Sequence, residues 1–295
     1  MTAARVFLLL CVVFWGWTFV ATKIVLEYLN IFEIFGLRLL LALPVLFIII
    51  RVKKLRFDFT RKEKNQLIIG GLIMTAHLFL QILGLKYTSA TNTGWIVGVT
   101  PLVMALMSYL ILREKLGWRG VFGITISTTG IVFLMSRGNL LNLDWLTSVG
   151  DWLVLATSHT WALYTIAVRD VVRRKDPLVV TFAVLLPSAV VMFGYMCCGS
   201  SWSKLFLLPL EPMLALIFLG VLGLAVGHWF WQEGVKRIGA ARAGIFLYLM
   251  PVATTALAVP YLHESFGLFT ALGGLLVLTG VWYSERKPAK SRSVR

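Results

Sequence analysis

KYTSATNTGWIVGVTP (86–101) and KRIGAARAGIFLYLMP (236–251) are two stretches of one chain that align without a gap at an offset of 150 residues. The same offset then matches Pro101 with Pro251, Glu114 with Glu264, Gly117 with Gly267, Gly123 with Gly273 and Gly130 with Gly280. Earlier in the chain FWGWTFVATK (14–23) lies against TWALYTIAVR (160–169), which pairs Trp15 with Trp161. The sequence therefore predicts two copies of one structural unit.

The composition indicates that both copies lie in a membrane. Of 295 residues, 59% are hydrophobic and 14% are charged, whereas soluble domains are usually about 45–50% apolar and about 25% charged. Apolar runs of about 20 residues are long enough to cross a bilayer as helices. We predict an all-α integral membrane protein with ten transmembrane helices. The predicted spans are 6–25, 33–50, 67–85, 91–112, 118–136, 149–168, 178–197, 212–234, 241–262 and 267–284.

The net charge of +15 is distributed as in a membrane protein. If the N-terminus is cytoplasmic, 23 of the 28 Lys and Arg residues fall on the cytoplasmic side and three on the other. Such a bias sets the orientation of a membrane protein and predicts that both termini are cytoplasmic, in the inner membrane of the cell. The basic loops then face anionic membrane lipid, and nucleic acid is not expected as a partner.

An odd number of helices in each copy means that the two copies cross the membrane in opposite directions. We expect a first five-helix repeat over 1–137, a linker over 138–144, a second repeat over 145–285 and a basic cytoplasmic tail over 286–295. Two inverted repeats around a central cavity are the usual plan of secondary transporters.

Each copy also carries the pattern P-x12-E-x2-G-x5-G-x6-G, which begins at Pro101 and Pro251. With the opening FWGWTFVATK, this pattern resembles the EamA family of the drug/metabolite transporter superfamily. The resemblance covers the whole chain. It implies ten helices, cytoplasmic termini, a central cavity and the transport of metabolites or amino acids, mostly by export. Distant relatives handle sugar-nucleotides and other solutes.

Two polar pairs interrupt the apolar runs at the same spacing. They are His77 with Gln81 in HLFLQ and His228 with Gln232 in HWFWQ. Positions i and i+4 share one face of a helix, and buried polar groups in a membrane usually face the bundle interior. We expect both pairs to line the cavity and bind substrate, with a proton-coupling role for either histidine left open. The alternative is that they hold helices together by hydrogen bonds.

Aromatic residues inside the spans suggest an aromatic wall to the same cavity, suited to apolar or cationic substrates. The candidates are Trp15, Trp95, Trp161, Tyr164 and Tyr248, and His159 lies near two of them. Packing within the bundle or against lipid is the alternative for each. No metal site and no cofactor are expected, because the histidines lack a carboxylate partner and a ligand spacing.

Further residues suggest moving parts. Pro101 and Pro251 fall near the centres of two spans, where each frees a backbone carbonyl (Val97 and Leu247) and forms a hinge or a simple kink. Lys23 and Arg38 are expected to reach the membrane surface and pair with Glu27 and Glu33, or else to gate anions. Glu114 and Glu264 end helices and suit a structural or gating role.

The function that these features favour is secondary transport of small organic metabolites, with export of amino acids or related compounds first. Carriers of drug-like cations or of sugar or nucleotide derivatives are the alternative. A membrane-embedded enzyme or receptor is less favoured, because the chain has no HExxH, GxSxG or Walker A motif and no long extramembrane segment. Gly-x-x-x-Gly spacings at Gly94/Gly98 and Gly223/Gly227 fit close contact between the halves or a homodimer.

Overall fold

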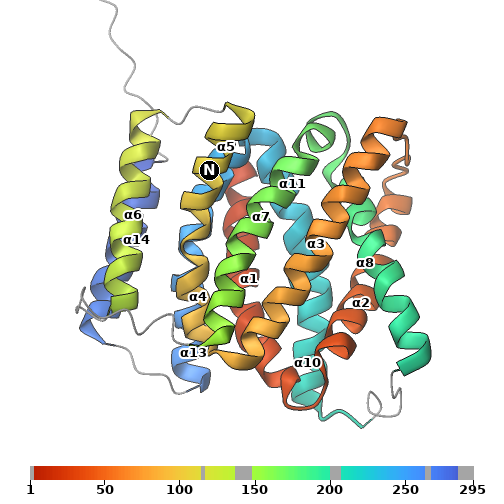
Figure 1. Ribbon diagram of the computed structural model, residues 1–295, viewed down its shortest axis with the longest axis horizontal. Helices are drawn as coiled ribbons and strands as arrows, with labels where there is room; N and C mark the ends of the chain where they lie inside the picture. The colour runs from red at the N-terminus through yellow and green to blue at the C-terminus, as the bar shows by residue number, and fades with distance from the viewer. Residues whose placement is uncertain (1–2, 114–116, 137–147, 200–206, 263–266, 285–295) are drawn as a thin grey trace, which may run out of the picture.

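The computed structural model describes residues 3–113, 117–136, 148–199, 207–262 and 267–284, which form a bundle of helices (Figure 1). The described helices are grouped here into ten candidate spans. They are α1 (Ala3–Leu26), α2 (Ile31–Val52), α3 (Arg61–Tyr87), α4 with α5 (Ala90–Val97 and Thr100–Leu112), α6 (Trp118–Ser136), α7 (Val149–Arg174), α8 (Pro177–Gly199), α10 with the π-helix η2 and α11 (Leu210–Phe218, Leu219–Val226 and Gly227–Ile238), α12 with the 3₁₀-helix η3 and α13 (Ala240–Ile245, Phe246–Leu249 and Met250–Leu262), and α14 (Leu268–Ser284). The predicted all-α membrane fold is confirmed.

Seven of these spans are each long and apolar enough, by length and composition, to cross a membrane. Among the described residues α6, α7 and α14 fall outside that group. These three are packed along neighbours, because α6 runs beside α14 and α7 runs beside α3 (Figure 1). The bundle therefore includes helices that length and composition alone do not identify as membrane spans.

Capping boxes set the start of α2, α3 and α7. In each, the side chain of the cap (Asn30, Thr60 or Ser148) accepts a backbone N–H, and an acidic side chain three residues later accepts the N–H of the cap. At α7 this acid is Asp151, which also accepts hydrogen bonds from Thr88 and Asn92. The start of α7 is thereby tied to the end of α3 and the start of α4.

The contact between α6 and α14 shows the relation between the repeats. A Cβ on Gly123 would lie 2.6 Å from the carbonyl oxygen of Gly280, and one on Gly130 would lie 2.7 Å from that of Gly273. The repeat matches Gly123 with Gly273 and Gly130 with Gly280, so each glycine contacts the counterpart of the other. A twofold axis produces this exchange of partners, and here it relates two halves of one chain.

Small residues also let α1 approach the second repeat closely. A Cβ on Gly223 would lie 2.6 Å from the Thr18 side chain, and one on Gly227 would lie 2.7 Å from Trp15 Nε1. Gly94 meets Thr254 of α13 in a similar way, at 3.0 Å. These spacings serve contact between the halves, and a homodimer stays a prediction without support from them.

Four of the predicted features lie outside the described residues. They are Glu114, Glu264, the linker 138–144 and the tail 286–295.

Candidate functional site

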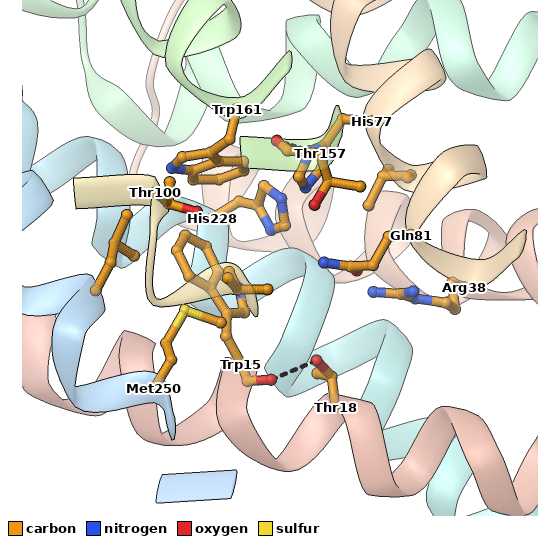
Figure 2. Close-up of a pocket in the computed structure, with 13 residues that line it drawn as sticks. Trp15, Thr18, Arg38, His77, Gln81, Thr100, Thr157, Trp161, His228 and Met250 are labelled. Atoms are coloured by element: carbon orange, nitrogen blue, oxygen red, sulfur yellow. Dashed lines mark hydrogen bonds between the residues drawn. The ribbon is translucent and has the colours of Figure 1, made fainter. Parts of the chain in front are cut away.

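A cavity lies inside the bundle where helices of the two repeats meet (Figure 2). The first repeat lines it with Trp15, Thr18, Arg38, His77, Leu78, Gln81, Val97 and Thr100, and the second with Thr157, Trp161, His228, Leu247 and Met250. The cavity has a free volume of about 30 Å³, whereas pockets for small organic ligands usually have about 300–1,000 Å³. The cavity is therefore much smaller than a site that holds a small organic ligand.

Aromatic rings from both repeats form one wall of this cavity. The ring centroids of Trp15 and Trp161, which the repeat equates, lie 4.8 Å apart in an edge-to-face arrangement. Trp161 also lies 5.0 Å from His77, and Trp15 lies 5.2 Å from His228. Each tryptophan thus contacts the histidine of the opposite repeat. The same twofold axis that relates α6 to α14 therefore passes through this cluster.

The two histidines use the same ring nitrogen to contact a backbone carbonyl. His77 Nδ1 lies 3.2 Å from the carbonyl oxygen of Thr157, and His228 Nδ1 lies 3.3 Å from that of Gly223. A carbonyl only accepts, so in each ring Nδ1 donates and the neutral imidazole keeps Nε2 as an acceptor. His228 Nε2 is buried with no hydrogen-bond partner among the described residues. A ligand with a donor group could satisfy it.

The π-helix η2 supplies the carbonyl that holds two of these rings. In a π-helix each backbone hydrogen bond joins residues five positions apart, as from the N–H of Gly227 to the carbonyl of Leu222 in η2. The carbonyl of Gly223 accepts from Trp15 Nε1 at 3.0 Å as well as from His228. This irregular turn fixes α1 against α11 at the cavity. The sequence does not predict it, because a run of glycine and aliphatic residues has no π-helical signature.

Arg38 lies in the cavity wall and not at the membrane surface. Arg38 is only 3% exposed, and its side chain has no ion pair or hydrogen bond to the described residues. Glu33, its predicted partner, accepts the backbone N–H of Asn30 at 2.8 Å in the capping box of α2. The prediction that Arg38 extends to the surface and pairs with Glu33 is wrong, because α2 turns this side chain toward α3 and the bundle interior. Lys23 is half-buried near the end of α1 and does not line the cavity.

The family is shown by a match over both halves of the chain. Residues 2–136 and 148–284 each match the EamA-like transporter family. The chain belongs to the EamA-like transporter family. It is accordingly a multi-pass membrane protein of a family of transporters, as its pattern of prolines, glutamates and glycines predicted.

Other members of the EamA family resemble this chain over nearly their whole length. The uncharacterized transporter YyaM of Bacillus subtilis is 28% identical over 91% of this chain and 89% of its own. An uncharacterized transporter of Archaeoglobus fulgidus is 25% identical over 95% and 96%. A protein of Streptantibioticus cattleyicolor named a probable terminal-alkyne amino-acid exporter is 24% identical over 95% and 92%. A crystal structure 20% identical in sequence has the same fold, with a TM-score of 0.75 over 95% of this chain and 97% of that one.

The cavity of this EamA family member includes five of the ten residues predicted to line it. These are Trp15, His77, Gln81, Trp161 and His228. None of its three threonines was predicted, although Thr18 and Thr157 each lie one helical turn from a predicted tryptophan, at i+3 and i−4. This spacing places each of these two threonines on the same helix face as a tryptophan, and it was the feature of the sequence that pointed to them.

The second polar pair does not lie along the cavity as the first does. Gln232 is fully buried and its amide donates to the hydroxyl of Tyr164, which is also fully buried. These two side chains form a hydrogen bond between α11 and α7, so the prediction that they line the cavity is wrong. In this pair the alternative of interhelical hydrogen bonding holds, because α11 turns away from the cavity within one helical turn.

Three other predicted residues also lie elsewhere. His159 is exposed, with Nδ1 3.3 Å from the carbonyl of Leu155, because two residues along a helix are about 200° apart and Trp161 faces inward. Tyr248 is buried, and its hydroxyl lies 2.7 Å from that of Thr128 on α6. Trp95 is buried in α4 without lining the cavity. Tyr248 and Trp95 pack within the bundle, which was the stated alternative, whereas His159 faces outward.

The two prolines coincide with breaks in their helices. The span containing Pro101 is interrupted between Val97 and Thr100, and the span containing Pro251 passes through the 3₁₀-helix η3. Both residues whose carbonyls a proline would free, Val97 and Leu247, line the cavity. The breaks therefore lie at the depth of the cavity in both repeats, where a change of helix direction would alter its width.

Proposed function

We propose that this protein is a secondary transporter that exports small organic metabolites, first among them amino acids or related compounds, by alternating access between its two inverted halves. The observation that carries the proposal is a cavity with polar and aromatic walls at the twofold axis, lined by both repeats. Rocking one half against the other would expose such a cavity to each side in turn.

The contracted state of the cavity fits a step of this cycle. About 30 Å³ of free space is too little for a metabolite, so transport requires that the halves separate on one side. The breaks at Pro101 and Pro251 are the proposed hinges, because their backbone lacks the hydrogen bonds of a continuous helix. A relative named as a probable amino-acid exporter supports the substrate class at low identity. Both termini are proposed to be cytoplasmic, in the inner membrane of the cell.

The first experiment identifies cargo in cells. Overexpression is combined with a panel of amino acids, toxic amino-acid analogues and other metabolites, and growth is compared with an empty-vector strain. Export predicts tolerance to some members of the panel and lower intracellular levels of those compounds. A strain that tolerates none of them contradicts the export proposal.

The second experiment measures flux directly in liposomes without ATP. Purified protein is expected to move the identified compound down its gradient faster than protein-free liposomes do. Trp161→Phe, in the cavity, should reduce this flux at least several-fold, while Trp152→Phe, exposed on the same helix, should not. Equal flux in both variants removes Trp161 from the transport site, and no flux in the wild type contradicts secondary transport.

A further inference from the structure

Arg38 places a charge inside the bundle, and no described residue of opposite sign pairs with it. It is 3% exposed, its Nε is buried without a partner, and none of its side-chain nitrogens is bonded to the described residues. Removing a guanidinium from water without a partner is costly, and charges within membrane spans usually face a partner or a transport path. An anion entering the cavity would supply that partner.

None of the described residues that line the cavity would neutralise Arg38. The lining residues include no Asp or Glu in the part of the chain that the structure describes. The other polar side-chain groups there are hydroxyls, two imidazoles, the indole N–H groups of Trp15 and Trp161, and the amide of Gln81. The cavity is therefore positively charged whenever its histidines are neutral, and more so when either is protonated. It would repel a cation.

The second repeat shows that the fold does not require this charge. Aligning Pro44 of α2 with Pro187 of α8 sets Arg38 against Thr181. Thr181 is also buried, at 1% exposure, and its hydroxyl donates to the carbonyl of Pro177 at 2.8 Å. One repeat thus packs the same position with a neutral side chain that is satisfied within its own helix. The charge at Arg38 breaks the symmetry of the two halves and calls for a role other than packing.

We propose that Arg38 binds the carboxylate of the transported compound, so that this carrier selects organic anions with a flat apolar body. This inference rests on the transport function proposed above and names its substrate class. The planar guanidinium can donate two parallel hydrogen bonds to a carboxylate, a geometry that a point charge does not offer. Figure 2 shows Arg38 and Gln81 on the right of the view, with the rings of Trp15, Trp161 and His228 toward its left.

In this arrangement each part of the ligand has a partner. The carboxylate lies on Arg38, with the amide of Gln81 as a further donor, since that amide has no hydrogen bond to the described residues. The apolar body packs on the indoles of Trp15 and Trp161. An ammonium group is not needed for binding, because the described lining offers no carboxylate to receive it. Simple carboxylic acids should therefore bind as amino acids do.

The test compares three probes that share one ring and differ in charge: benzoate, benzamide and benzylamine. Dissociation constants are measured by calorimetry with the full-length protein in nanodiscs of zwitterionic lipid. Benzoate should bind at least about tenfold more tightly than benzamide, and benzylamine should bind most weakly. If benzamide or benzylamine binds as tightly as benzoate, or if benzoate does not bind, the proposal is overturned.

Variants assign the preference to Arg38. Arg38→Gln should abolish the difference between benzoate and benzamide, whereas Arg51→Gln, exposed near the end of the same helix, should preserve it. Arg38→Lys keeps the positive charge but cannot donate two parallel hydrogen bonds, so it should retain part of the preference for benzoate. This variant also tests the assignment if Arg38→Gln does not fold. An unchanged preference in Arg38→Gln, or its loss in Arg51→Gln, overturns the assignment.

Flux of benzoate in liposomes separates this inference from the proposed function. Binding that depends on Arg38 without any flux would support the anion site and contradict transport. Flux that is equal in wild type and Arg38→Gln would support transport and overturn the anion site.

Discussion

Replacing Gly280 by alanine tests the contact between α6 and α14, which relates the two repeats most directly. An added Cβ would lie 2.6 Å from the carbonyl oxygen of Gly123 and would also overlap the hydroxyl of Ser127. A backbone carbonyl in a helix cannot move aside as a flexible side chain can, so the two helices must separate. We expect Gly280→Ala to destabilise the protein.

The size of the effect follows from a control on the same helix. A Cβ on Gly274 would have no atom within 4 Å among the described residues. Alanine in place of glycine favours a helix by up to about 1 kcal/mol, and this gain is common to both variants. Overpacking usually costs about 1–3 kcal/mol, and only Gly280→Ala incurs it. The free energy of unfolding should therefore be lower in Gly280→Ala than in Gly274→Ala by about 1–3 kcal/mol.

The assay is equilibrium unfolding in mixed detergent micelles, followed by tryptophan fluorescence. Gly123→Ala should resemble Gly280→Ala, because each added Cβ meets the other glycine's carbonyl at 2.6 Å. The double variant should cost less than the sum of the two, since helices already separated by one methyl group admit the second more easily. Equal stability of Gly280→Ala and Gly274→Ala would refute the close contact and, with it, the twofold exchange of glycines.

Three further predictions concern topology, packing and the site. Cysteines placed at Arg113 and Leu268, in a variant with its native cysteines replaced, should react with an impermeant maleimide from opposite sides of the membrane; labelling from one side contradicts the inverted repeat. Tyr164→Phe leaves the amide of Gln232 without its partner and should lower the free energy of unfolding by about 1–3 kcal/mol, while the exposed Tyr109→Phe should change it by less than about 0.5 kcal/mol; equal losses would refute the hydrogen bond. His159→Ala should transport at the wild-type rate and His77→Ala should not, as measured by flux in liposomes; the reverse result would contradict the lining of the cavity.

The sequence by itself determined the helical membrane fold and the equivalence of the two halves. Apolar runs of membrane-spanning length, and matched residues such as Pro101 and Pro251 at one offset, are local features that any reader of the chain can count. Helix starts at Asn30, Thr60 and Ser148 are also local, since a capping box needs only a polar cap and an acid three residues later. Pairing Trp15 with Trp161 as repeat equivalents likewise led to two side chains that meet at the axis.

Only the tertiary structure decided which face of each helix turns toward the cavity. In a membrane the bundle interior and the surrounding lipid are both apolar, so the pattern of apolar residues does not distinguish the inner face from the outer one. Contacts with helices far away in the chain made that choice. They turned Arg38 inward and His159 outward, joined Gln232 to Tyr164, and used the π-helix η2 to hold Trp15 and His228 on one carbonyl.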